Sequence, residues 1–137
     1  MTYQERKQWL ERYRVCIDRI EDLREIQRAA RDSAERVTPG NSGDIQQSGN
    51  DSRVERAIVT IRSAEKEIKA LEDAGSRFKR EIVSSICGLS PKLSTTATAH
   101  FIQGVSSKDL ARISGKTKRA IEKRIQKIIL YAKIPGA

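Results

Sequence analysis

The sequence contains little of what catalysis or metal binding requires. Among its 137 residues there is one histidine, His100, and a lone histidine on a helix is typical of a structural role. No group of His, Cys, Asp and Glu has metal-ligand spacing. The glycine-rich segment around residue 45 lacks the preceding strand and the Lys-Ser/Thr ending of a phosphate-binding loop. We therefore expect a protein that is not an enzyme and that has no cofactor and no metal.

Cysteine is also scarce, which argues against a disulfide framework. Cys16 and Cys87 each lie in an apolar helical pattern, so we expect both to be small buried side chains. The N-terminus shows no signal peptide, and no apolar run is long enough to span a bilayer. We expect a cytoplasmic protein with no membrane partner, in a compartment where structural disulfides are rare.

Aromatic residues make up only 4% of the chain and there are only three prolines, whereas charged residues make up 33%. A chain rich in Glu, Lys, Arg and Ala and poor in aromatics favours helices over sheets. Such a composition fits apolar stripes along long helices better than one large core. We expect an all-α protein, in which a long antiparallel, coiled-coil-like helical hairpin precedes a smaller helical unit.

Acidic residues are nearly missing from the C-terminal third of the chain, so the excess positive charge is concentrated there. The net charge is +9, from 27 Lys and Arg against 18 Asp and Glu. Residues 92–137 hold 10 of these basic residues and only 2 of the acidic ones. A concentrated positive field attracts polyanions and releases their counterions on binding. The segment has no broad apolar face with Trp or Phe, so a membrane-surface helix is the weaker interpretation.

The spacing of apolar residues predicts one long helix over residues 2–36. Thr2 and Glu5 fit a capping box at its start. Its charged residues interleave in sign, so we expect a solvent-exposed face with pairs between residues three or four apart. The apolar stripe, at spacings of three and four, consists of Leu10, Tyr13, Ile17, Ile20, Leu23 and Ile26, widened by Trp9, Cys16 and Ala30.

A second long helix is predicted from Asp51 or Ser52 to about Cys87, after a break over residues 37–52 that contains one proline and three glycines. Its apolar residues form an a/d heptad pattern, which is typical of a helical seam. Because the seam and the wide first stripe can serve two neighbours, we expect a homodimer. The a/d positions are Val54, Ala57, Ile61, Ala64, Ile68, Leu71, Gly75, Phe78, Ile82, Ser85 and Leu89.

Residues 106–127 predict a helix-turn-helix. Ser106 or Ser107 can cap a first helix, Gly115 supplies the left-handed turn residue, and Thr117 can cap a second helix that runs to about Lys133. A helix from Ser94 or Thr95 to Gly104 would complete a three-helix unit. The expected core residues are Phe101, Ile102, Val105, Leu110, Ala111, Ile113, Ile121, Ile125, Ile128 and Ile129.

The second helix of this motif pairs an apolar anchor with a basic face. Ile121 and Ile125 hold one side against the domain, which leaves Lys and Arg on the other, as in a helix that enters a DNA major groove. Lys116 and Arg124 stand where apolar residues are commoner, and Ile125 is the candidate to replace the second anchor. The predicted DNA-binding residues are Lys108, Lys116, Thr117, Lys118, Arg119, Glu122, Lys123, Gln126 and Lys127.

The order of these segments resembles the phage-encoded late-gene transcription regulators of Gram-positive bacteria, the RinA/ArpU-like group. The likeness lies in a long helix, a loop, a second long helix and a helix-turn-helix similar to sigma factor region 4. It implies DNA binding upstream of late operons and places Thr117, Lys118, Arg119, Glu122 and Lys123 at recognition positions. The matching loop residues are Thr38, Pro39, Asp44, Ile45, Gln46, Ser48 and Gly49.

The function expected from the sequence is a sequence-specific transcription regulator, an activator of phage or prophage late genes. Its partners would be double-stranded DNA, a second copy of the chain and, as a further candidate, RNA polymerase. Residues 1–90 would form the hairpin and residues 91–137 the DNA-binding domain. Two other classes stay open. A DNA-packaging protein such as a small terminase subunit also joins a helix-turn-helix to oligomerising helices, and a coiled-coil protein can sequester a host factor.

Overall fold

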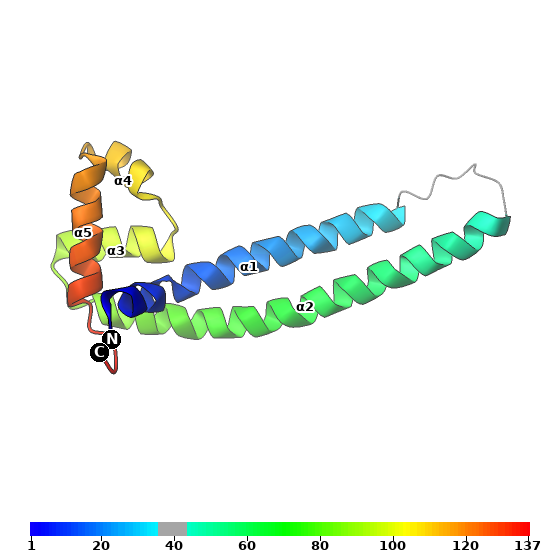
Figure 1. Cartoon of the computed structure of the whole chain (residues 1–137), viewed down its shortest axis with the longest axis horizontal. Coiled ribbons are helices and arrows are strands. Elements are labelled where there is room, and N and C mark those ends of the chain that lie inside the picture. The colour runs from blue at the N-terminus through cyan, green and yellow to red at the C-terminus, as the bar shows by residue number, and fades with distance from the viewer. Residues whose placement is uncertain (36–43) are drawn as a thin grey trace. The chain divides into compact units, whose positions relative to one another are not determined.

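The computed structural model describes the backbone of residues 1–35 and 44–137 and the side chains of residues 1–35 and 52–137. All regular structure in these ranges is helical, which confirms the all-α prediction (Figure 1). None of the described helices is long and apolar enough to cross a bilayer. The elements are α1 (Tyr3–Glu35), α2 (Asp44–Ile86), α3 (Pro91–Ala97), the π-helix η1 (Thr98–Ile102), α4 (Ser107–Ser114) and α5 (Lys118–Tyr131).

The start of α1 has the predicted capping box. The Thr2 N–H donates to the Glu5 carboxylate (2.9 Å), and the Glu5 N–H donates to the Thr2 hydroxyl (3.2 Å). Two backbone donors of the first turn are therefore satisfied by side chains.

Helix α2 begins at Asp44, which corrects the predicted break over residues 37–52. Residues 44–52 contain a single glycine, Gly49, and no proline. A glycine inside a helix costs only about 1 kcal/mol, and each residue added to an existing helix gains a hydrogen bond. The predicted loop residues Thr38 and Pro39 lie outside the described residues, and Asp44, Ile45, Gln46, Ser48 and Gly49 belong to the helix.

Helix α3 also begins earlier than predicted, at Pro91 rather than at Ser94 or Thr95. A proline cannot continue α2, but at the first position of a helix its missing N–H costs nothing. Pro91 thus follows the end of one helix and starts the next.

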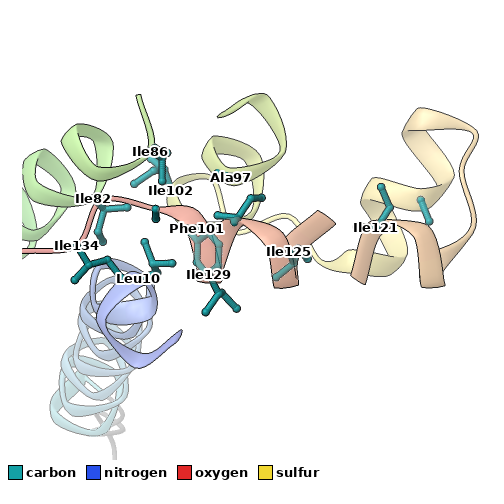
Figure 2. Packing of buried hydrophobic residues seen from close by; sticks show 13 residues of the cluster. Leu10, Ile82, Ile86, Ala97, Phe101, Ile102, Ile121, Ile125, Ile129 and Ile134 are labelled. Atoms are coloured by element: carbon teal, nitrogen blue, oxygen red, sulfur yellow. The ribbon is translucent and has the colours of Figure 1, made fainter. Parts of the chain in front are cut away.

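The described residues divide into two compact units: residues 1–16 with 74–137, and residues 17–73. This division differs from the expected boundary at residue 90. The cause is the core of the first unit, in which Leu10 of α1 and Ile82 and Ile86 of α2 pack with the C-terminal helices (Figure 2). Residues 91–137 therefore share their core with the N-terminal part of α1 and the C-terminal part of α2.

In the core of the first unit, Phe101, Leu10 and Ile82 are almost fully buried. Of the predicted core residues, Leu110 and Val105 are half-buried, and Ile113 is 72% exposed, which corrects its placement in the core. Ile113 lies two residues after the buried Ala111, about 200° further around the helix, so it lies on the opposite side of α4 from Ala111.

In the second unit, α1 and α2 bury Ile20, Leu23, Ala64 and Ile68. Gln27, rather than the predicted Ile26, continues the buried stripe, and its amide donates to the Ile61 carbonyl (3.1 Å). Alternating steps of four and three keep to one face of a helix with 3.6 residues per turn, whereas two successive steps of three do not. Ile26 is consequently exposed, and Val54 at the start of the heptad pattern is also exposed.

Several arginines of α1 reach across to α2, where pairs within one helix were expected. Arg19 pairs with Glu67 (3.2 Å), and Arg24 pairs with Glu72 (3.3 Å). Both pairs are solvent-exposed, so each adds less than about 1 kcal/mol. From Arg19 to Gln27 along α1, the partner on α2 moves back from Glu67 to Ile61, an antiparallel order that confirms the predicted hairpin.

Candidate nucleic-acid interface

The turn between α4 and α5 has the predicted geometry. The Ser106 hydroxyl accepts from the Asp109 N–H (3.2 Å) and caps α4. Gly115 adopts a left-handed φ of 68°, and the Lys116 N–H donates to the Ala111 carbonyl (3.0 Å), as in a Schellman motif. The Thr117 hydroxyl accepts from the Ala120 N–H (3.1 Å) and caps α5. The orientation of α5 relative to α4 is therefore set by local hydrogen bonds.

One side of α5 is buried along its whole length. Ile121 is 1% exposed and Ile125 is 9% exposed, and Ile128 and Ile129 continue this side. Ile125 takes the anchor position that Arg124 leaves vacant. All nine residues predicted to bind DNA have exposed side chains.

The structure gathers only part of the predicted set on one face. Arg119, Lys123 and Gln126 follow one another at steps of four and three, so they form a continuous row opposite the buried isoleucines. Lys127 extends the edge of this row. We call these four residues the basic face.

The other predicted residues lie around the basic face. Glu122 lies seven residues before the buried Ile129 and therefore on nearly the same side of the helix, and it pairs with Lys118 (3.9 Å). Thr117 is engaged as the cap, Lys116 lies in the turn, and Lys108 lies in the first turn of α4. The net charge of the exposed surface is strongly positive because only Asp109 and Glu122 are acidic among residues 92–137.

Sequence reasoning missed the residue that holds the other end of α5. Arg6 of α1 donates from Nε to the Ile129 carbonyl (2.6 Å) and from Nη2 to the carbonyls of Leu130 (3.0 Å) and Ala132 (2.6 Å). A guanidinium at a helix C-terminus satisfies free carbonyls and complements the helix dipole. No sequence signal marks this pairing.

A second arginine of α1 lies at the end of η1. The Arg14 guanidinium donates to the Ile102 carbonyl (3.4 Å) and packs directly on Gly104, which has a φ of 76°. A side chain at residue 104 would meet this guanidinium, since an added Cβ would lie 2.5 Å from its central carbon. Glycine is favoured here by its backbone angle, and a Cβ would also displace the Arg14 guanidinium.

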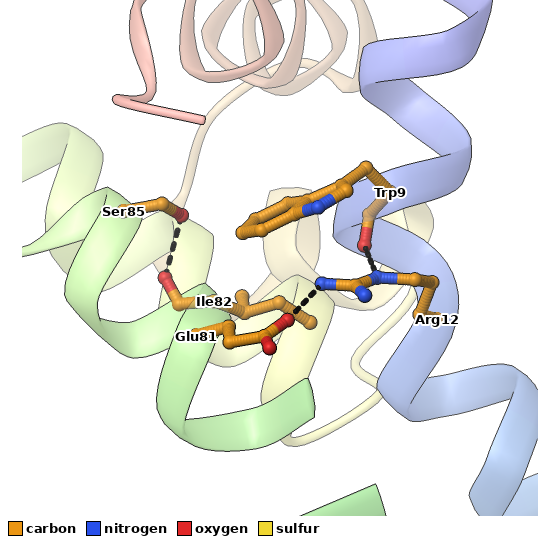
Figure 3. A network of polar contacts seen from close by, with 5 residues as sticks. All are labelled: Trp9, Arg12, Glu81, Ile82 and Ser85. Carbon is orange, nitrogen blue, oxygen red and sulfur yellow. Dashed lines mark hydrogen bonds and ion pairs between the residues drawn. The ribbon is translucent and has the colours of Figure 1, made fainter. Parts of the chain in front are cut away.

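A third arginine of α1, Arg12, joins α1 to α2 (Figure 3). Its guanidinium carbon lies 4.3 Å from the ring centroids of both Trp9 and Phe78, and Nη2 donates to the Glu81 carboxylate (2.7 Å). Cation–π contacts and a partly buried ion pair thus act on the same side chain. This cluster stabilises the part of the hairpin on which the helix-turn-helix packs.

The remaining titratable candidates have structural contacts. His100 bonds through Nδ1 to the Val105 carbonyl (2.8 Å), and its ring packs edge-on against Phe101 at 4.8 Å between centroids. Cys16 is buried, as predicted, but Cys87 is exposed, because it follows the last residue of α2 and lies one step past the buried Ile86.

Comparison of the chain with protein-family models, with curated proteins and with solved structures finds no match.

Proposed function

We propose that the protein is a sequence-specific regulator that binds double-stranded DNA through α5. The observation that carries this proposal is the basic face, whose exposed side chains lie on a helix with a buried row of isoleucines on its opposite side. A helix presented in this way, by a helix-turn-helix with both caps formed, suits insertion into a major groove.

The residues divide between base reading and phosphate contact. Arg119, Lys123 and Gln126 occupy the centre of the exposed side, where bidentate contacts with guanine or adenine edges are made. Lys108, Lys116 and Lys127 lie at its margins, where contacts with the phosphate backbone position the protein. Glu122 is the weaker base-reading candidate because it faces Lys118 and lies beside the buried isoleucines.

We further propose that the protein acts on phage or prophage late genes as a homodimer. The resemblance of the domain order to late-gene activators supports the first part. Exposed apolar side chains at Ile26, Ile58 and Val59 of the second unit support an interface with another copy. Static light scattering tests the oligomer: a dimer fits a regulator, whereas a large ring would favour DNA packaging.

The decisive experiment is selection of a binding site from random duplex DNA, followed by affinity measurements with variants. Arg119→Ala should weaken the selected site by about 1–3 kcal/mol and relax sequence preference at one base pair. Lys127→Ala should weaken all sequences alike and reduce the salt slope by about one.

Arg62→Ala is the matched control, because it removes one positive charge from an exposed position of the second unit. If Arg62→Ala weakens binding to the selected DNA site as much as Arg119→Ala, the affinity depends only on the total charge of the protein. The proposal that α5 recognises DNA sequence then fails. Selection that enriches no site at all would have the same consequence.

A further inference from the structure

An apolar groove of about 600 Å³ lies beside the helix-turn-helix, between α3, α4 and α5. Ala99, Val105, Leu110, Ile113 and Ile121 contribute its apolar surface. Ile113, at 72% exposure, is the most exposed large apolar side chain among the described residues. Exposing an isoleucine side chain to water is unfavourable in free energy. Covering the side chain with an apolar partner would remove this cost.

The hydroxyl groups that line the groove have their donor hydrogens engaged within the protein. Thr95, Thr96 and Ser114 each donate their hydroxyl to the carbonyl four residues earlier in their own helix, at 2.8, 3.0 and 2.6 Å. These side chains therefore present mainly carbon to the groove. The groove therefore favours apolar groups of a ligand, although threonine and serine are among its lining residues.

Two cations border this apolar surface. Lys92 and Arg124 line the groove, and none of its lining residues is acidic. Within the described part of the chain, neither cation forms an ion pair or hydrogen bond, although Arg124 is half-buried. A partly desolvated guanidinium without a partner favours an incoming carboxylate.

The groove and the basic face are on different sides of α5. Arg124 lies three residues after the buried Ile121, and both line the groove. Arg119 and Lys123 lie about 160° or more from Ile121 around the helix and do not line it. A ligand in the groove would therefore leave the basic face open.

We propose that this groove is a binding site for an acidic amphipathic segment of a partner protein. Apolar side chains of that segment would cover Leu110 and Ile113, and carboxylates on its flanks would pair with Lys92 and Arg124. This is helix-in-groove recognition with charge complementarity at the rim. It does not depend on DNA binding, because the two surfaces are separate.

The test uses the full-length chain and a synthetic acidic peptide with leucines on one face of a helix and glutamates on the other. A second peptide keeps every glutamate but replaces the leucines with glutamine. Binding is measured by titration calorimetry and mapped by amide chemical shifts. We expect the first peptide to shift amides of Ala99, Leu110 and Ile113, and to bind at least about tenfold more tightly than the second.

Two groove variants and one control complete the design. Ile113→Asp and Arg124→Met should each weaken the peptide about tenfold or more, since one removes the apolar contact and the other removes the cation. Leu130→Asp alters a 54% exposed residue of α5 outside the groove and should leave affinity unchanged. Far-ultraviolet circular dichroism confirms that each variant is folded.

Three results would overturn the proposal. Equal binding of both peptides would show simple charge attraction, and shifts confined to the basic face would place the peptide elsewhere. Conversion of a dimer to a monomer by Ile113→Asp, measured by light scattering, would show that a second copy of this chain occupies the groove.

Discussion

Arg6 offers the sharpest test of how the hairpin supports the helix-turn-helix. Its side chain lies across the C-terminal end of α5 and donates to three carbonyls, those of Ile129, Leu130 and Ala132. Replacing Arg6 with Ala removes the guanidinium but keeps the helical backbone of α1, because alanine has the highest helix propensity. The measured loss then reports the contact with α5.

The magnitude follows from the number and exposure of the bonds. A hydrogen bond from a charged group contributes about 1.5–3 kcal/mol when buried, but here one of the three is exposed and water reaches the carbonyls once the side chain is gone. The favourable interaction with the helix dipole adds about 0.3–1 kcal/mol. We expect Arg6→Ala to lower the free energy of unfolding by about 2–3 kcal/mol in all.

The assay is urea unfolding followed by fluorescence of Trp9, the single tryptophan, which lies partly buried in the first unit. Arg6→Lys should recover only part of the loss, because an ammonium cannot reproduce the planar fork of donors. Lys7→Ala is the control, since Lys7 is half-buried like Arg6 but forms only one pair, at 3.9 Å. A loss for Arg6→Ala no larger than that for Lys7→Ala would refute the reasoning.

Three further substitutions test the packing and the turn. Gly75→Ala should stabilise the protein by about 0.5–1 kcal/mol, because the new Cβ would lie at an ordinary 3.7 Å from that of Cys16; a lower urea midpoint would show that the helices are too close there. Gly115→Ala should destabilise it by about 1 kcal/mol, since φ is 68°, and an unchanged midpoint would mean that the turn relaxes. Phe101→Ala should lower the free energy of unfolding by about 3–5 kcal/mol. Tyr131→Ala, at an exposed position, should lower it by less than about 0.5 kcal/mol. Equal losses for the two variants would contradict the proposed core.

Much of the candidate site was predictable because its determinants act over a few residues. The caps at Ser106 and Thr117 and the left-handed Gly115 depend on side chains within three or four positions of the groups that they satisfy. The buried side of α5 follows from the spacing of Ile121 and Ile125. Exposure of the predicted residues on the far side of α5 follows from the same helical period.

Other features depended on distant parts of the chain. The groove that Ile113 borders results from how α4 packs on α3 and α5, and helical spacing alone does not determine this packing. The partners of Arg19 and Arg24 depend on the register between two helices, since an arginine on α1 has equally placed carboxylates on its own helix.

The sequence by itself determined the helical character of the chain, the caps at Thr2, Ser106 and Thr117 and the turn at Gly115, because hydrogen bonds and side-chain periodicity within one turn specify them. Only the tertiary structure decided what surrounds this motif. Arg6 lies 123 residues from Ile129 along the chain, yet the two share a hydrogen bond. Leu10, Ile82 and Ile86 join the core of the C-terminal helices in the same way. No local pattern encodes such pairings, because they depend on packing between segments far apart in the sequence.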